Sequence, residues 1–174
     1  MKIERVVVGS LDENCYVLKI NDTCLVVDPG AEYLKIKELI GECKILGILI
    51  THSHFDHIGA LRHFLNKKNM KIFKKSNLEE KLYEVGDFKF KVIFNPGHST
   101  DSVSFYFEEE EKMIVGDFVF KNTVGRCDLP GGDISVMYES IEKIKTYPSG
   151  TVLYPGHGDS TTLGDEIENN KYFK

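Results

Sequence analysis

Three histidines and one aspartate fall within six positions of the segment Thr51-His52-Ser53-His54-Phe55-Asp56-His57. Imidazole nitrogens and carboxylate oxygens are ligands of zinc, iron and manganese. In a turning loop His52 and His54 can point to one side, while Asp56 and His57 reach a neighbouring point. Two groups of ligands a few ångströms apart are what a dinuclear metal site needs. A chance gathering of histidines on a polar loop would explain one His-x-His pair, but explains this longer pattern poorly.

Three more candidate ligands follow strand-like runs elsewhere in the chain. His98 and His157 end two Pro-Gly-His turns, and Asp117 ends Val115-Gly116-Asp117. Five histidines and two aspartates supply two sites with three ligands each and leave one carboxylate to bridge them. The remaining histidine, His63, is expected on the surface of a helix. The repeated Pro-Gly-His suggests two halves that each deliver one such turn, with the site between them.

The elements that must position these residues are mostly short strands. Runs of β-branched and aromatic residues bounded by turn residues predict them. The predicted strands are Ile3–Val8, Tyr16–Ile20, Cys24–Val27, Leu46–Ile50, Phe88–Phe94, Val103–Phe107, Met113–Val115 and Thr151–Tyr154. The acidic run Glu108–Glu111 is expected to be a solvated turn between two of them.

Helical spacing of apolar residues alternates with these strands. It predicts a helix carrying Ile36, Leu39, Ile40 and Cys43, one over Ile58–Leu65, one after Asp133 with Asp133 as its N-cap, and one over Leu163–Asn170. Two mixed sheets flanked by helices, in one domain over residues 1–174, is the architecture that fits this order.

Composition narrows the class of protein. The 174 residues include 27 acidic and 22 basic side chains, a net charge of −5, which argues against a nucleic-acid partner. The longest apolar stretches, such as Ile45–Ile50, are far too short for a membrane helix, and no signal peptide is visible. The four cysteines form no Cys-x-x-Cys pair, so reduced thiols and a cytoplasmic location are expected.

With these residues in view, the sequence resembles the metallo-β-lactamase-fold hydrolases, and within them the glyoxalase II (hydroxyacylglutathione hydrolase) group. The matching motifs are Val-Val-Asp28-Pro-Gly, His52 to His57, Pro96-Gly97-His98-Ser99, Val115-Gly116-Asp117, Gly125 to Gly132, and Pro155-Gly156-His157-Gly158. The resemblance implies an α+β fold, a four-layer αββα sandwich with metals at one sheet edge.

The resemblance also implies ligand roles. They are His52, His54 and His98 for a first metal; Asp56, His57 and His157 for a second; and Asp117 as the bridge. Two divalent ions are expected, zinc first, with iron or manganese fitting the same ligands. Asp28 either supports the ligands or simply caps a turn.

The chemistry expected of such a site is thioester hydrolysis. Two metals can lower the pKa of a shared water towards about 7, and the hydroxide held between them attacks a carbonyl carbon. A thiolate leaves readily because the pKa of a thiol is about 8.5. Asp56 is expected to orient the hydroxide as well as bind metal. The partner is thus a small-molecule substrate, without nucleic acid or membrane; the oligomeric state is left open.

Three alternatives stand beside this reading. A persulfide dioxygenase with a single iron shares much of the motif set. A β-lactamase is disfavoured, because the resemblance leads us to expect another residue type at the position of Asp117. A non-enzymatic redox or binding scaffold is the remote third. Metal counting separates the first from the hydrolase.

Residues for substrate recognition are harder to assign. Arg126 can meet a substrate carboxylate bidentately, or it can tie its loop to Asp128. Cys127 is expected to be structural, because the metals take the histidines that would activate it. Lys67-Lys68 and Lys74-Lys75 are expected to be solvated surface.

The sequence departs from full-length glyoxalase II enzymes after the last ligand. Only 17 residues follow His157, whereas those enzymes carry a helical C-terminal domain that supplies much of the glutathione-binding surface. We therefore expect this chain to share the metal chemistry of the glyoxalase II enzymes, but we do not assume their specificity for glutathione.

Overall fold

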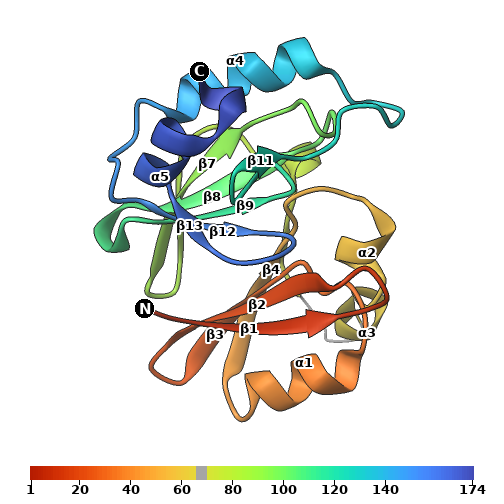
Figure 1. Cartoon of the computed structure of the whole chain (residues 1–174). Helices are drawn as coiled ribbons and strands as arrows, with labels where there is room; N and C mark the ends of the chain where they lie inside the picture. Colours follow the sequence, from red (N-terminus) through yellow and green to blue (C-terminus); the bar gives the residue numbers. More distant parts are fainter. Residues whose placement is uncertain (66–69) are drawn as a thin grey trace.

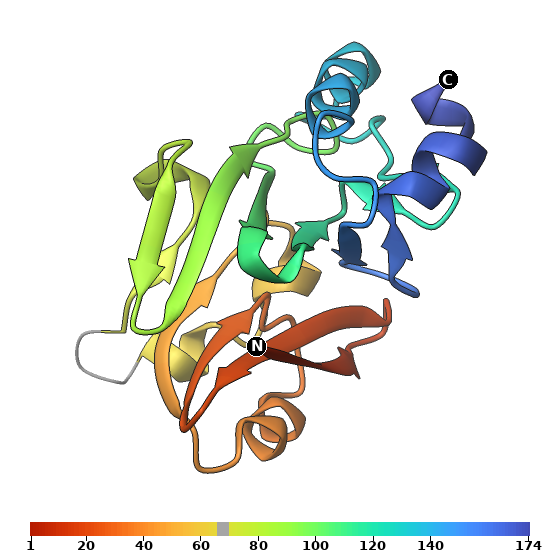
Figure 2. The same cartoon turned by 90° about the vertical axis from the view of Figure 1, so that its left-hand side faces the viewer.

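The structure, a computed structural model, describes residues 1–65 and 70–174 of the chain. Its architecture is a sandwich of two sheets between two layers of helices (Figure 1). Figure 2 shows the same layers after a turn of 90°. Lys67-Lys68 lies outside the described residues, whereas Lys74 is exposed and Lys75 is half-buried, with its Nζ donating to the carbonyl of Thr100 at 2.6 Å.

The first sheet is formed by the N-terminal part of the chain. Its strand order is β1-β2-β3-β4-β5, with antiparallel pairing from β1 to β3 and parallel pairing from β3 to β5. The strands are β1 (Lys2–Val8), β2 (Glu13–Ile20), β3 (Thr23–Val27), β4 (Lys44–Leu49) and β5 (Ile72–Phe73).

The second sheet has the order β13-β12-β9-β8-β7-β6, and a two-stranded ribbon, β10-β11, accompanies it. The strands are β6 (Leu82–Val85), β7 (Phe88–Phe94), β8 (Val103–Phe107), β9 (Lys112–Gly116), β10 (Val119–Phe120), β11 (Thr123–Val124), β12 (Val152–Pro155) and β13 (Thr161–Thr162).

Strand direction explains where the candidate ligands meet. Strand β8 is antiparallel to both β7 and β9, and β12 is parallel to β9, so β7, β9 and β12 all run the same way. Their carboxyl ends therefore share one edge of the second sheet, and the loops after them carry His98, Asp117 and His157. Strand β4 of the first sheet ends beside that edge and leads into Thr51 and the histidine motif.

Five α-helices cover the outer faces of the sheets in the described part of the chain. Near the first sheet lie α1 (Tyr33–Ile40), α2 (Phe55–Ile58) and α3 (Arg62–Leu65); near the second lie α4 (Ile134–Ile144) and α5 (Leu163–Asn169) (Figure 1). Asp133 caps α4 as the sequence predicts, its carboxylate accepting the backbone N–H of Ser135 at 2.8 Å. Short 3-10 turns occupy Lys75–Asn77, Glu108–Glu110 and Lys171–Phe173. None of the described helices is long and apolar enough to cross a membrane.

Side-chain alternation along the strands builds three apolar layers. In β3, Leu25 faces the other sheet, whereas its neighbours Cys24 and Val26 face the helices of the first layer. In β8, Phe105 faces the first sheet and Tyr106 faces α4. Because the central strands β3 and β8 are buried on both faces, they read as nearly continuous apolar runs, and the helices become the outer layers.

Two expectations are wrong. The single helix expected over Ile58–Leu65 is two short helices, α2 and α3, which are separated at residues 59–61. The two Pro-Gly-His turns do not come from different halves, because β7 and β12 both belong to the second sheet. The first sheet contributes the histidine motif instead, so the site does lie between the two sheets.

Candidate metal centre

The first group of donor atoms contains three imidazoles. Nε2 of His52 lies 3.0 Å and Nε2 of His98 lies 2.9 Å from Nδ1 of His54. His52 and His98 are buried and His54 is half-buried. Three nitrogen atoms from two sheets thus converge on one point, in a group that could hold a metal ion.

The second group lies beside the first and has one carboxylate. Oδ2 of Asp56 is 3.8 Å from Nε2 of His57 and 3.3 Å from Nε2 of His157. Asp56 and His57 belong to the short helix α2, and His157 comes from the turn after β12. These three residues form a second group that could hold an ion.

Asp117 lies between the two groups. Its Oδ1 is 3.3 Å from Nε2 of His57, and its Oδ2 is 3.6 Å from Nε2 of both His98 and His157. One carboxylate thus faces a histidine of the first group and two of the second. The position is the one that a bridging ligand requires.

Hydrogen bonds outside the cluster orient four of the rings. Nδ1 of His98 lies 2.7 Å from the carbonyl of Arg126, and Nδ1 of His157 lies 3.0 Å from that of Leu11. A carbonyl only accepts, so each Nδ1 carries the proton and each Nε2 presents a lone pair to the cluster. Such partners fix the tautomer and the ring orientation of metal-binding histidines.

Asp28 and Thr51 do the same for the other two rings. The carboxylate of Asp28 lies 3.0 Å from Nδ1 of His57 and accepts both the backbone N–H and the hydroxyl of Thr51, at 2.8 and 2.6 Å. The Thr51 hydroxyl donates its hydrogen bond to Asp28. Its oxygen can therefore only accept from Nδ1 of His52, which lies 3.1 Å away. Asp28 therefore contacts a candidate ligand histidine and ties the residue after β4 to the end of β3.

The protonation of the second group reflects its carboxylates. Burial lowers the pKa of His57, but the carboxylates of Asp117 and Asp28 beside its two ring nitrogens outweigh burial and raise that pKa well above its ordinary value. The hydrogen bond to Asp56 likewise raises the pKa of His157. Burial of Asp117 is outweighed by His57, which lowers the carboxyl pKa to about 2.

The first group behaves in the opposite way. Burial, followed by the charge of His57, lowers the pKa of His52 to about 2. Burial also lowers the pKa of His98. These two imidazoles are therefore neutral at physiological pH and ready to bind a cation.

A carboxyl group missed by the sequence analysis lies behind this cluster. Glu13, at the start of β2, is 1% exposed, and Oε1 is 3.8 Å from Nδ1 of His57. Burial, with the nearby charge of Asp28, raises its pKa to about 10. No motif marks Glu13, because a glutamate beginning a strand looks like any surface residue in sequence.

Gly156 allows the loops to approach this closely. A Cβ atom at Gly156 would lie 2.2 Å from Oδ1 of Asp117 and 2.6 Å from Cε1 of His57. Any other residue type would therefore push apart two candidate ligands, Asp117 and His57, which come from different sheets. The glycine of this Pro-Gly-His turn is a steric requirement of the cluster.

The atoms of this cluster do not satisfy one another's hydrogen-bonding capacity, whereas metal ions would. Nε2 of His57 and Oδ1 of Asp117 are both buried, and neither finds a hydrogen-bond partner among the described residues. Buried polar atoms of this kind are costly unless something satisfies them. Two groups of nitrogen and oxygen donors with a carboxylate between them fit two divalent cations.

A pocket of about 560 Å³ opens directly over the cluster. This volume is within the range of about 300–1,000 Å³ that is typical of small-molecule sites. Its floor includes ligand candidates from both groups. Four apolar side chains line it as well: Leu11, Phe55, Phe120 and Leu129.

Arg126 lines the same pocket and contacts Asp128. Its Nε and Nη2 donate to the two carboxylate oxygens of Asp128, each at 2.7 Å, and both side chains are exposed. The loop-tying contact expected for Arg126 is therefore present. Its Nη1 has no partner among the described residues.

The two remaining reactive side chains lie apart from the donor groups. His63 is exposed and stacks on Tyr33, with ring centroids 4.9 Å apart. Cys127 is half-buried, and its thiol contacts the carbonyl of Gly125 at 3.4 Å. No disulfide joins the four cysteines, of which Cys15 and Cys24 lie in the core.

Comparison with known proteins agrees with this geometry. The model of the Metallo-beta-lactamase superfamily matches residues 8–82 and 75–157. The chain is 34% identical to the Probable metallo-hydrolase YqgX of Bacillus subtilis, over 99% of this chain and 97% of the relative. It is 27% identical to the Hydroxyacylglutathione hydrolase GloC of Haemophilus influenzae, over 99% and 98% of the two chains.

Two solved structures are similar over almost their whole length. The BLEG-1 B3 metallo-beta-lactamase superposes with a TM-score of 0.93 at 29% identity, covering 99% of this chain and 100% of that one. TTHA1623, solved in a di-iron-bound form, superposes with a TM-score of 0.87 at 31% identity, covering 97% and 99%.

Proposed function

The chain belongs to the metallo-beta-lactamase superfamily, and on this basis we propose that it is a hydrolase that cleaves a small thioester at a dinuclear metal site. The observation that carries the proposal is the convergence of two three-ligand groups with Asp117 between them. The hydroxyacylglutathione hydrolase among its relatives supports thioesters as the substrate class.

The proposed ligands divide by group. His52, His54 and His98 would hold one ion, Asp56, His57 and His157 the other, and Asp117 both. When bound, two divalent ions polarise a carbonyl and make water a nucleophile at neutral pH. We assign zinc as the first candidate metal. Iron is the second candidate, because the similar structure of TTHA1623 was solved in a di-iron-bound form.

The residues of the chain have separate tasks in this reaction. Oδ2 of Asp56 faces the pocket between His57 and His157, where it would accept a hydrogen bond from the attacking water and orient it. The apolar side chains of Leu11, Phe55 and Phe120 would hold the acyl group and exclude bulk water. The thiolate needs no strong acid to leave, since its conjugate thiol has a pKa of about 8.5.

Arg126 is the proposed substrate contact at the rim of this pocket. Asp128 occupies Nε and Nη2 and thereby holds the guanidinium in place. Nη1 is left to donate to an oxygen of the substrate. We also propose that the enzyme acts in the cytoplasm, where its four cysteines, which form no disulfide, would stay reduced.

The test combines metal analysis with substrate panels. Protein purified without added metal is analysed for zinc, iron and manganese, loaded to two ions per chain, and offered a series of thioesters. We expect thioester hydrolysis that Asp56→Asn reduces by about 100-fold. The matched control Asp22→Asn, at an exposed aspartate that does not line the pocket, should leave hydrolysis unchanged.

The same preparation distinguishes the alternatives. One iron per chain with oxygen uptake on a persulfide would assign a dioxygenase instead. Faster turnover of a chromogenic cephalosporin than of every thioester would assign a β-lactamase. A fully loaded protein that hydrolyses no thioester would refute the proposal.

A further inference from the structure

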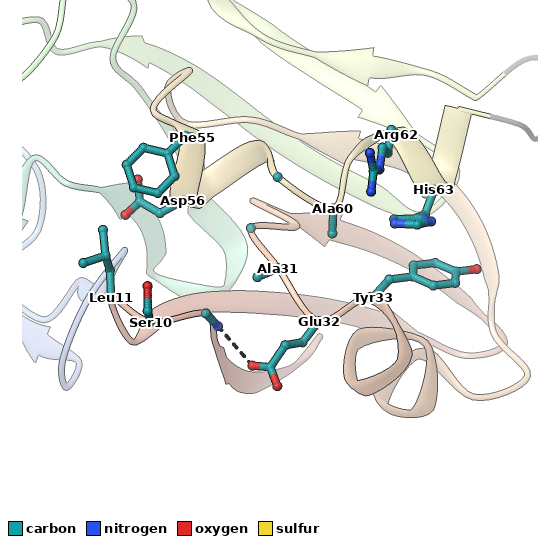
Figure 3. A pocket seen from close by; sticks show the side chains of 13 residues that line it. Ser10, Leu11, Ala31, Glu32, Tyr33, Phe55, Asp56, Ala60, Arg62 and His63 are labelled. Atoms are coloured by element: carbon teal, nitrogen blue, oxygen red, sulfur yellow. Dashed lines mark hydrogen bonds between the residues drawn. The ribbon is translucent and has the colours of Figure 1, made fainter.

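A second pocket lies beside the one over the metal cluster. It has a volume of about 390 Å³. Three residues, Leu11, Phe55 and Asp56, line both pockets. Figure 3 shows these three at one end of the second pocket and Tyr33, Arg62 and His63 at the other. A ligand that reaches the metal cluster can therefore extend into the second pocket past Leu11 and Phe55.

The middle of this pocket is formed by small residues. Gly30, Ala31, Gly59 and Ala60 line it between the two ends. Their size follows from a close approach, since a Cβ at Gly30 would lie 1.7 Å from the carbonyl oxygen of Asp56. The result is a shallow passage without bulky side chains, which suits an extended chain of atoms.

The far end carries one uncompensated positive charge. The side chain of Arg62 is exposed, and its guanidinium has no hydrogen bond or ion pair with any residue that the structure describes. The acidic residue of the pocket, Glu32, is already engaged, since its carboxylate accepts the N–H of Gly9 at 3.0 Å and pairs with Lys35 at 2.6 Å. The charge of Arg62 is thus available to an anion, in contrast to that of Arg126.

Two of the residues shared by the two pockets are apolar side chains that are exposed to solvent. Phe55 is 72% and Leu11 is 50% exposed, although both are large and apolar. Exposed apolar side chains on either side of a passage are typical of binding grooves. A ligand that runs between Phe55 and Leu11 would cover both side chains and displace the water around them.

We propose that the second pocket binds the distal part of an elongated thioester whose far end is an anion, a carboxylate or a phosphate, held by the guanidinium of Arg62. The inference rests on the proposed thioesterase function and narrows its substrate class. It makes Arg62 a specificity-determining residue, which contacts the substrate at a distance from the reacting carbonyl.

The test uses thioesters with one acyl group and one length of thiol arm. Their arms end in a carboxylate, a phosphate or a neutral carboxamide. For the two anionic substrates we expect Arg62→Ala to raise KM about five- to tenfold with kcat within about twofold, and Arg62→Lys to restore most of the loss. For the carboxamide we expect no change. The ratio between the carboxylate and the phosphate identifies the preferred anion.

Lys37→Ala is the matched control. Lys37 is an exposed cation on α1 that does not line the pocket, so its removal changes the net charge by the same amount. We expect no change with any substrate. Equal losses for Arg62→Ala and Lys37→Ala, or equal losses on charged and neutral arms, would overturn the assignment.

A binding measurement separates this inference from the proposed function. Non-hydrolysable thioether analogues with the same three arms are titrated into the protein by calorimetry. Tighter binding of the anionic arms, lost in Arg62→Ala, supports the pocket even if no thioester is hydrolysed. Equal affinity of wild type and Arg62→Ala for all three analogues would refute the pocket, whatever the activity of the enzyme.

Discussion

His98 and His54 point ring nitrogens at each other across 2.9 Å, although one follows β7 of the second sheet and the other follows β4 of the first. The carbonyl of Arg126 holds the proton of His98 on the opposite nitrogen, so the atom that faces His54 presents a lone pair. Nε2 of His52 lies 3.0 Å from the same nitrogen of His54 and also presents a lone pair, because Nδ1 of His52 donates to Thr51. One N–H of His54 cannot serve both lone pairs, so a shared cation explains the meeting of the three rings better than a simple hydrogen bond.

Removing one ring of this pair should remove one ion. We expect His98→Ala to bind about one divalent ion per chain instead of two, because the first group keeps only two of its three histidines. Metal content is measured by mass spectrometry after exhaustive dialysis. His63→Ala removes a histidine that lies outside both groups and should keep two ions. Retention of two ions by His98→Ala would contradict the assignment.

Acidification should empty the second group before the first. In the metal-free protein the pKa of His57 and of His157 is raised, so a metal that binds there must displace protons. The pKa of His52 is about 2 and that of His98 is lowered, so protons compete little for the first group. Lowering the pH from about 8 to about 5.5 therefore weakens the second site more.

Single-site variants make this comparison direct. His98→Ala leaves the second group intact, and His157→Ala leaves the first group intact. Metal affinity measured by competition with a chelator should fall more steeply with decreasing pH in His98→Ala. The same slope in both variants would show that the raised and lowered pKa values do not govern metal uptake.

Filling the space beside Gly156 should disrupt the cluster. Its substitution by alanine places a methyl group 2.2 Å from Asp117 and 2.6 Å from His57, and the loops of two sheets must move apart. We expect Gly156→Ala to lose metal binding and about 1–3 kcal/mol of unfolding free energy, measured by urea denaturation. Gly150→Ala is the control, because its closest contact is a flexible carboxylate at 3.1 Å. Normal metal content in Gly156→Ala would argue against a rigid cluster.

Arg126 should act on binding more than on chemistry. With Nη1 free and the rest of the guanidinium held by Asp128, we expect Arg126→Ala to raise KM severalfold and to leave kcat within about twofold. Steady-state kinetics with the best thioester measures both constants. A large fall in kcat at unchanged KM would exclude Arg126 as a binding contact.

Sequence patterns predicted most of the elements that carry the site. The strands before the ligands were visible because each is buried on both faces and ends in a turn residue. The strands β5, β10, β11 and β13 are missed, because two residues are too few to show alternation. Strand β6 is also missed, because only one of its four residues is buried. The break between α2 and α3 was also missed, because the apolar residues of this segment kept helical spacing across it.

The ligand candidates were visible in sequence, but their supporting groups were not. His52 to His57 form a recognisable motif, whereas Thr51 and Glu13 become meaningful only when folding brings them to His52 and His57. The second pocket was equally hidden, because Leu11, Phe55 and Arg62 come from separate segments that meet only at the surface. Contacts of this kind depend on tertiary packing rather than on local pattern.

Each proposed metal site takes ligands from both sheets, and this has a consequence for the stability of the chain. An ion bound by His52, His54 and His98 is a reversible cross-link between distant segments, comparable with a disulfide, and the ion at His57 and His157 closes a still longer loop. The four cysteines form no such link. The persistence of the folded protein would therefore follow the supply of metal ions rather than the redox state of its surroundings.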